Sequence, residues 1–233
     1  MNVTTILMII VLIILLYWIF SWIFSKSSTL TRLSDATVNQ IILANTLPNN
    51  SYSNNYTYSM WIYVNDWNYR FGEPKIILGR LDGNSNPSPS ITLGAMENNL
   101  NIAVSCYPTN SNSTTPVIHQ CNVSNVPLQR WTNILVSVYG RTLDAYLDGK
   151  LVRTCVLPGV PKVSSTSNIT ITPNGGFNGQ TSNVQYWESP TNPEQAFNIY
   201  SNGYAGSVLA NFLNSFGFKI TFTSGNSQGS VNL

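Results

Sequence analysis

Side chains alternate strictly between two faces in residues 56–64, whose sequence is YTYSMWIYV. Successive side chains of a β-strand point to opposite faces, so this alternation predicts a strand rather than a helix. Residues 134–138 and 143–147 alternate in the same way, which predicts two further half-buried strands. The face of the first strand that we expect in the core consists of Tyr56, Tyr58, Met60, Ile62 and Val64.

The segments between these strands carry turn signals. Asp148-Gly149 separates residues 143–147 from residues 150–157, and an Asp-Gly pair readily takes the positive φ angles of a two-residue type I′ hairpin. Clusters of Asn, Gly, Pro and Ser separate the other short segments, which is typical of an all-β protein. The remaining strands are predicted at residues 37–47, 74–81, 90–96, 100–106, 117–123, 168–172 and 179–187. The predicted fold is a sandwich of two antiparallel sheets packed face to face.

The N-terminal segment has a different character. Residues 1–25 carry no charge, and the apolar run from Ile6 to Phe24 has about the length that a helix needs to cross a ~30 Å hydrocarbon layer. A cleaved signal peptide is the alternative, but the segment lacks a basic beginning and a small-residue cleavage site. We therefore predict one transmembrane α-helix, held in the bilayer by Ile6, Leu7, Ile10, Ile13, Leu16, Trp18, Trp22 and Phe24.

The charges that flank this helix predict its orientation. No Lys or Arg precedes it, whereas Lys26 and Arg32 follow it, so the positive-inside tendency places the C-terminal domain on the cytosolic side. The predicted organisation is an anchor at residues 1–25, a stalk at 26–35, a β-sandwich at 36–204 and a tail at 205–233.

Three blocks of the sequence resemble the concanavalin A-like lectin/glucanase superfamily in its laminin G-like form. They are YSMWIYV at residues 58–64, WTNILVSVYGRTLDAYLDGKLV at 131–152 and GGFNGQTSNVQYWESPTNPEQAFNIYSNG at 175–203. The resemblance covers about residues 37–204. It implies a two-sheet jelly roll with a short Pro-Glu-Gln helix that closes at Ile199-Tyr200.

The charged residues argue against two classes of function, nucleic-acid binding and glycoside hydrolysis. The 11 Lys and Arg residues are scattered along the chain, so the basic patch of a nucleic-acid-binding protein is missing. Glycan-cleaving members of the superfamily carry an E-x-D-x-x-E run because retaining hydrolysis needs two carboxylates about 5 Å apart, and this sequence has no such run. The lone His119 has no nucleophile motif beside it. We predict no catalytic residue, no cofactor, no enzymatic activity and no nucleic-acid partner.

The cysteines and one acidic loop leave alternatives open. Cys106 and Cys121 could pair across neighbouring strands, although the odd total of three cysteines favours free thiols in a reducing compartment. Asp82, with Asn84 and Asn86 beside it, could hold calcium as in some laminin G-like modules, but an ordinary Asp-Gly turn is the favoured interpretation. No other metal site is predicted.

Aromatic and amide side chains cluster in residues 61–69, at the end of the first predicted strand and just after it. Such side chains could bind a glycan, since rings stack on sugars and amides bond to hydroxyl groups. The alternative, which we favour, is that the rings pack under loops. The candidate glycan-binding residues are Trp61, Tyr63, Trp67 and Tyr69, with Asn65 and Asn68.

Residues 205–233 form a tail that the predicted β-sandwich does not require. Its apolar residues could fold back onto the sandwich or add a strand or helix to a neighbouring subunit, and the sequence does not decide between these. The candidate partner-contact residues are Phe212, Phe216, Phe218 and Phe222.

The chain, with an N-terminal transmembrane helix followed by an Asn-rich module, also resembles virion proteins of large icosahedral DNA viruses. These viruses enclose an internal membrane. This resemblance implies a minor capsid or virion membrane protein that lies in the internal membrane beneath the capsid. The function that we expect is non-catalytic tethering, with the lipid bilayer and capsid proteins as partners. The alternative is a membrane-displayed lectin that binds glycans.

Overall fold

The computed structural model describes residues 29–48, 54–108, 115–204, 219–224 and 227–232. The predicted anchor at 1–25 lies outside these residues, as do Phe212, Phe216 and Phe218 of the tail. Within the described part of the chain, no helix is long and apolar enough to span a bilayer. Phe222 belongs to strand β14 (Lys219–Ser224), which pairs with β15 (Ser227–Asn232) in an antiparallel hairpin.

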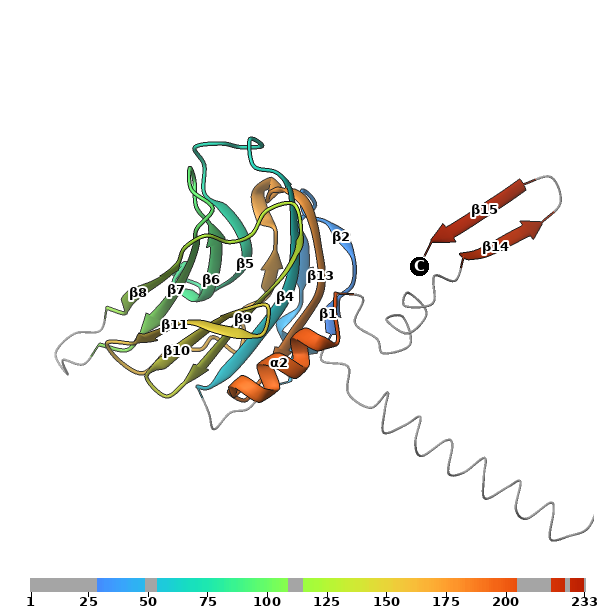
Figure 1. Ribbon diagram of the computed structural model, residues 1–233. Helices are drawn as coiled ribbons and strands as arrows, with labels where there is room; N and C mark the ends of the chain where they lie inside the picture. The colour runs from blue at the N-terminus through green and yellow to red at the C-terminus, as the bar shows by residue number, and fades with distance from the viewer. Residues whose placement is uncertain (1–28, 49–53, 109–114, 205–218, 225–226, 233) are drawn as a thin grey trace, which may run out of the picture.

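Apart from this hairpin, the described strands form two antiparallel sheets, as the alternation predicted (Figure 1). Sheet A has the order β1 (Thr29–Thr31), β13 (Asn178–Trp187), β4 (Tyr56–Asp66), β9 (Trp131–Tyr139), β10 (Thr142–Leu147), β11 (Lys150–Val156), and β2 (Ser34–Asp35) also pairs with β13. Sheet B has the order β3 (Gln40–Ile42), β12 (Ile169–Ile171), β5 (Lys75–Leu81), β6 (Pro87–Leu93), β7 (Leu100–Cys106), β8 (Val117–Val123). Two short 3-10 helices, η1 (Ala44–Thr46) and η2 (Pro173–Gly175), lie in the connections.

Two of these strands correct the predicted stalk. Residues 26–35 were predicted to connect the anchor to the sandwich, but β1 and β2 lie within them and pair with β13 of sheet A. The sandwich therefore includes residues from Thr29 onward. Strands of two and three residues are too short to show an alternation, which explains why the sequence pattern missed them.

The hydrophobic core lies between the sheets. The predicted core face of β4 is confirmed, because Tyr56, Tyr58, Met60, Ile62 and Val64 all belong to the buried cluster. Sheet B contributes the buried side chains of its central strands to the same cluster: Leu78, Ile91, Leu93, Leu100, Ile102 and Val104. The other face of each sheet is left for solvent, loops or ligands.

The predicted Asp-Gly hairpin is also confirmed. Asp148 and Gly149 have φ angles of 49° and 72°, and Leu147 pairs with Lys150 across the turn. A Cβ atom added to Gly149 would lie 3.0 Å from the Tyr200 side chain and 3.1 Å from the Phe197 backbone. The turn therefore needs glycine both for its backbone conformation and for its close approach to the following helix.

That helix, α2 (Pro193–Ser201), lies across the outer face of sheet A (Figure 1). Asn192 and Gln195 form a reciprocal capping box, and Pro193 occupies the first turn, where its missing N–H costs nothing. Ala196 and Ile199 pack against Leu135 and Tyr146 of the sheet. The short Pro-Glu-Gln helix implied by the family resemblance is thus present, and it covers part of the outer face.

A disulfide joins the free edges of the two sheets. Cys121 on β8 is bonded to Cys155 on β11, with 6.1 Å between their Cα atoms, and Cys106 is a buried free thiol. The predicted Cys106–Cys121 pair is therefore wrong, as is the expectation of three free thiols. In the β7–β8 register Cys106 lies opposite Val117 and Cys121 opposite Ile102, so the two cysteines are separated by about 13 Å of strand, beyond the reach of a disulfide.

Candidate functional site

A pocket of about 280 Å³ opens on the outer face of sheet A, at the edge that β2, β13 and β4 form. The strand register explains how residues far apart in sequence meet there. Gln180 pairs with Asp35 on one side and with Tyr63 on the other, and Tyr63 pairs with Trp131. The residues lining this pocket, called here the Tyr63 pocket, are Asp35, Thr37, Tyr63, Asn65, Asn178, Gly179 and Gln180.

The polar groups of the Tyr63 pocket are held in place by local hydrogen bonds. The backbone N–H and the hydroxyl of Thr37 both donate to Oδ1 of Asp35 at 2.8 Å. These two bonds, the backbone one first, lower the pKa of Asp35, so its carboxylate is ionised at neutral pH. The Asn65 amide donates to Oδ1 of Asn178 at 3.2 Å, which fixes the orientation of both side chains.

The pocket depends on a glycine. A Cβ atom on Gly179 would lie 1.9 Å from the carbonyl oxygen of Tyr63, so no other residue allows β13 and β4 to approach this closely. The resulting pocket offers one carboxylate, several amides, a hydroxyl group and the half-buried ring of Tyr63. This set of groups suits a ligand rich in hydroxyl groups, because rings stack on sugar faces while amides and carboxylates bond to hydroxyls.

A row of aromatic rings continues from the pocket toward α2. Tyr63 and Trp131 lie 5.7 Å apart between ring centroids, and Trp131 stacks on Tyr204 at 4.7 Å with nearly parallel planes. Trp61 then contacts both Tyr204, at 6.3 Å, and Tyr200, at 5.5 Å. Hydrogen bonds from Ser182 and Asn183 of β13 to the carbonyls of Tyr204 and Gly203 hold the end of this row on the sheet.

Sequence comparison identifies the family. A laminin G-type family profile, described as the concanavalin A-like lectin/glucanases superfamily, matches residues 35–197. The chain belongs to this superfamily. No curated protein matches the sequence.

Comparison of folds gives the same architecture for this superfamily member. The botulinum neurotoxin serotype D ligand-binding domain in complex with N-acetylneuraminic acid matches with a TM-score of 0.56 and 11% identity, over 89% of this chain and 54% of that one. The binding domain of botulinum neurotoxin DC in complex with rat synaptotagmin II matches with a TM-score of 0.53 and 17% identity, over 84% and 51%. This chain spans about half the length of these proteins, and at such identities the likeness concerns the fold alone.

In this superfamily member the six predicted glycan-binding residues are divided between two places. Tyr63 and Asn65 line the Tyr63 pocket. Trp61 points to the same face of β4, but only 6% of its surface is exposed because Tyr200 stacks on it. Asp35, Asn178 and Gln180 were not predicted, since nothing in the sequence shows that residues more than 100 positions apart share one row of the sheet.

The other three candidates belong to the loop after β4. The Trp67 ring has the Lys75 ammonium 4.5 Å from its centroid, and its Nε1 donates to the carbonyl of Met96 at 3.3 Å. The Tyr69 hydroxyl donates to the carbonyl of Gly175 at 3.1 Å, and Asn68 is exposed. These contacts place both rings in structural roles under loops.

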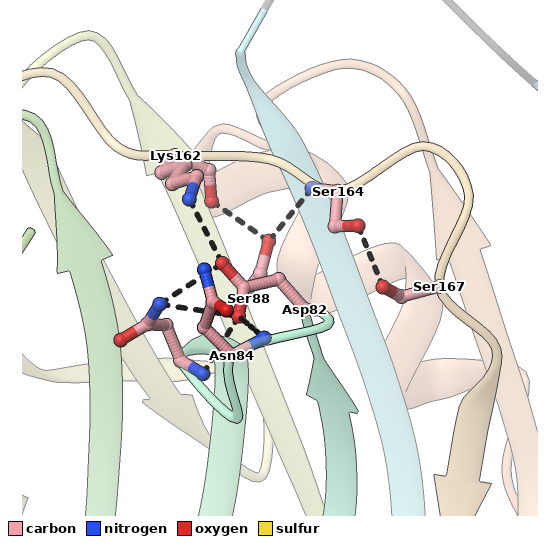
Figure 2. Close-up of polar contacts among 7 residues, drawn as sticks. Asp82, Asn84, Ser88, Lys162, Ser164 and Ser167 are labelled. Atoms are coloured by element: carbon pink, nitrogen blue, oxygen red, sulfur yellow. Dashed lines mark hydrogen bonds and ion pairs between the residues drawn. The ribbon is translucent and has the colours of Figure 1, made fainter.

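Asp82, the calcium candidate, is surrounded by hydrogen-bond donors (Figure 2). Its Oδ1 accepts from the backbone N–H groups of Asn84 and Asn86, and its Oδ2 forms an ion pair with Lys162 at 2.8 Å. The Lys162 side chain contributes most to holding the pKa of Asp82 far below its usual range. The turn that we favoured uses Asp82 as its acceptor, and the alternative, calcium binding, would require Lys162 to leave. No group of three or more His, Cys, Asp or Glu that could hold a metal occurs among the described residues.

A second, larger depression of about 620 Å³ lies on sheet A beside the beginning of α2. Asp144 lies in it and accepts a hydrogen bond from Thr154 at 2.6 Å. Two of the residues that line the depression are large and apolar, and both are exposed: Tyr139 by 66% and Leu151 by 48%. The residues lining this Asp144 groove are Ser137, Tyr139, Thr142, Asp144, Tyr146, Leu151, Thr154, Pro190, Thr191, Asn192, Pro193 and Gln195.

Proposed function

We propose that this chain is a membrane-anchored, non-catalytic binding protein whose Tyr63 pocket holds a glycan. The observation that carries the proposal is the convergence of the Tyr63 ring, the Asp35 carboxylate and the Asn65, Asn178 and Gln180 amides in one pocket. Its volume of about 280 Å³ is just below the roughly 300–1,000 Å³ of small-molecule sites, which suits one or two sugar units. The apolar run from Ile6 to Phe24 supports the anchor.

The composition of the pocket supports binding without catalysis. Glycoside hydrolysis needs two carboxyl groups that flank the scissile bond. Asp35 is the one carboxylate among the residues that line the Tyr63 pocket. The matching structures are also binding domains, one in complex with N-acetylneuraminic acid and another in complex with rat synaptotagmin II.

Glycan binding by the full-length chain in detergent tests the proposal. We expect a glycan array to give hits and calorimetry to give a Kd for the best of them. Tyr63→Ala should weaken binding by at least about tenfold, because the stacking face is lost. Asn65→Ala should weaken it less. Tyr107→Ala, which removes a ring that is 50% exposed and lies outside the pocket, is the matched control. Absence of hits, or equal loss in the control, would contradict the proposal.

A second candidate is the structural link expected from the sequence, between the internal membrane of a large DNA virus and its capsid. The Asp144 groove favours it, because the exposed apolar side chains of Tyr139 and Leu151 suit a protein partner. Lys150 is exposed next to Leu151 and is therefore a convenient reporter. In purified particles, an amine-reactive crosslinker should join Lys150 to a capsid protein. Crosslinks confined to other residues would argue against this role.

A further inference from the structure

The charge of the Tyr63 pocket limits which sugars it can accept. Asp35 is its one charged residue, and no Lys or Arg is among the residues that line it. Both hydrogen bonds from Thr37 reach Oδ1, so within the described part of the chain Oδ2 of Asp35 receives no donor. An unpaired carboxylate oxygen favours a ligand that brings a hydroxyl or an ammonium group.

We infer that the pocket selects neutral or amino sugars and rejects acidic sugars. This inference rests on the proposed glycan-binding function. A uronic or sialic acid would place a second negative charge near Asp35, and like charges at short distance repel. None of the residues that line the pocket is basic, so the lining itself holds no cation that would neutralise the second charge. The serotype D domain described above binds a sialic acid, so this pocket would differ from it in ligand class.

Matched sugar pairs test this inference with the full-length chain. The probes are glycans that end in glucose or galactose, the same glycans ending in glucuronate or galacturonate, and one ending in glucosamine. We expect the neutral member to bind at least about tenfold more tightly than its acidic partner, a difference that 0.5 M salt reduces. Asp35→Asn should reduce this difference in affinity, because it should strengthen binding of the acidic glycan.

The outcomes separate the two proposals. Equal or tighter binding of the acidic member overturns the charge selection but leaves the glycan-binding function standing. Binding of none of the five probes, together with an empty array, overturns both. If Asp35→Asn weakens the binding of neutral and acidic glycans equally, Asp35 acts only as a hydrogen-bond acceptor. This result would also overturn the selection by charge.

The Cys121–Cys155 bond bears separately on the side of the membrane that the sandwich faces. Disulfides persist in oxidising compartments and on cell or virion surfaces, and they are rare in the cytosol. The two sulfur-bearing residues are buried, on β8 and β11, so the bond belongs to the folded core. From this bond we infer that the sandwich lies on the non-cytosolic side of the membrane, opposite to the side that Lys26 and Arg32 predict. The inference rests on the proposed anchor.

Two exposed asparagines can report on which side of the membrane the sandwich lies. Asn122 and Asn168 each begin an N-x-S/T sequence and are exposed, so an oligosaccharyltransferase could modify them in the lumen of the secretory pathway but not in the cytosol. We expect the chain, made in eukaryotic cells, to carry N-glycans that the Asn122→Gln/Asn168→Gln variant reduces. We also expect its Cys121 and Cys155 to resist alkylation until a reductant is added.

Unmodified asparagines together with freely alkylated cysteines would overturn this orientation. Extraction of the membranes at alkaline pH tests the anchor itself, because a peripheral protein is released and a transmembrane one is not. A glycosylated chain that alkali releases would overturn the anchor and keep the non-cytosolic location.

Discussion

The indole ring of Trp61 stacks on the phenol ring of Tyr200, with 5.5 Å between their centroids and 21° between their planes. Trp61 lies on β4 in the middle of sheet A, whereas Tyr200 lies in the last turn of α2. The contact therefore holds the helix on the sheet, next to the Tyr63 pocket. The ring of Trp61, which the sequence suggested for glycan binding, is thus covered by Tyr200, and only 6% of the residue is exposed.

Removal of this ring should destabilise the protein. Trp61→Ala leaves a cavity under α2, and we expect it to lower the free energy of unfolding by about 3–5 kcal/mol. Chemical denaturation followed by tryptophan fluorescence and circular dichroism measures this change. Tyr107→Ala, at an exposed position, should change it by less than about 0.5 kcal/mol. Similar losses in the two variants would show that Trp61 does not support the helix.

Loss of the disulfide should have an effect of similar size. The bond closes a loop of 34 residues, for which chain entropy gives about 4 kcal/mol. Cys121→Ser should therefore unfold at a clearly lower denaturant concentration than the native chain, and a reductant should have little further effect on it. Cys106→Ala, which removes a buried free thiol, should cost about 1 kcal/mol and keep the response to reductant. A native chain that reductant does not destabilise would contradict the prediction.

The Asp82–Lys162 ion pair should make stability fall at low pH. Because hydrogen bonds from Lys162 and Asn86 lower the pKa of Asp82 in the folded state, the carboxylate stabilises the fold above the unfolded value near 4. This contribution is lost as the pH falls below 4 toward the folded pKa. The Tm of the native chain should thus drop more steeply below pH 4 than that of Asp82→Asn. Asp66→Asn, which alters an exposed carboxylate, controls for the mutation, and parallel curves for all three proteins would refute the expectation.

A buried guanidinium inside the sandwich provides a further test. Arg80 is 3% exposed, donates to the carbonyl of Ser167 at 3.1 Å and to the Tyr58 hydroxyl at 3.3 Å, and lies over the Tyr186 ring. Arg80→Ala should cost about 2–5 kcal/mol because it opens a cavity. Arg80→Met should cost less, since a buried charge can be replaced by an apolar chain of similar length at little loss. Equal costs would mean that the hydrogen bonds, not the packing, dominate.

The sequence predicted those parts of the fold that depend on neighbouring residues. The alternation in β4 and the Asp148-Gly149 turn are local signals, and the structure contains both. The strands β1 and β2 were missed because two or three residues cannot show a period. Helix α2 was expected from the family resemblance, although its position on the outer face was not.

The candidate site and the disulfide depend on information that a single sequence does not contain. Asp35 meets Tyr63 only because Gln180 of β13 lies between β2 and β4. Cys121 meets Cys155 only because the sheets end in β8 and β11 on the same side of the sandwich. Both pairings follow from the order and register of strands that are far apart in the chain, which local patterns do not specify.

Asp35 pairs with Gln180, and Gln180 pairs with Tyr63. This pairing limits how far from the membrane a ligand of the Tyr63 pocket could lie. Asp35 follows Phe24 by eleven residues, which span at most about 40 Å even when fully extended. With residues 6–24 in the bilayer, the Tyr63 pocket would therefore stay within about 40 Å of the lipid surface. Sugars carried on the same membrane, or on a surface pressed closely against it, are within that range, whereas those on a distant particle are not.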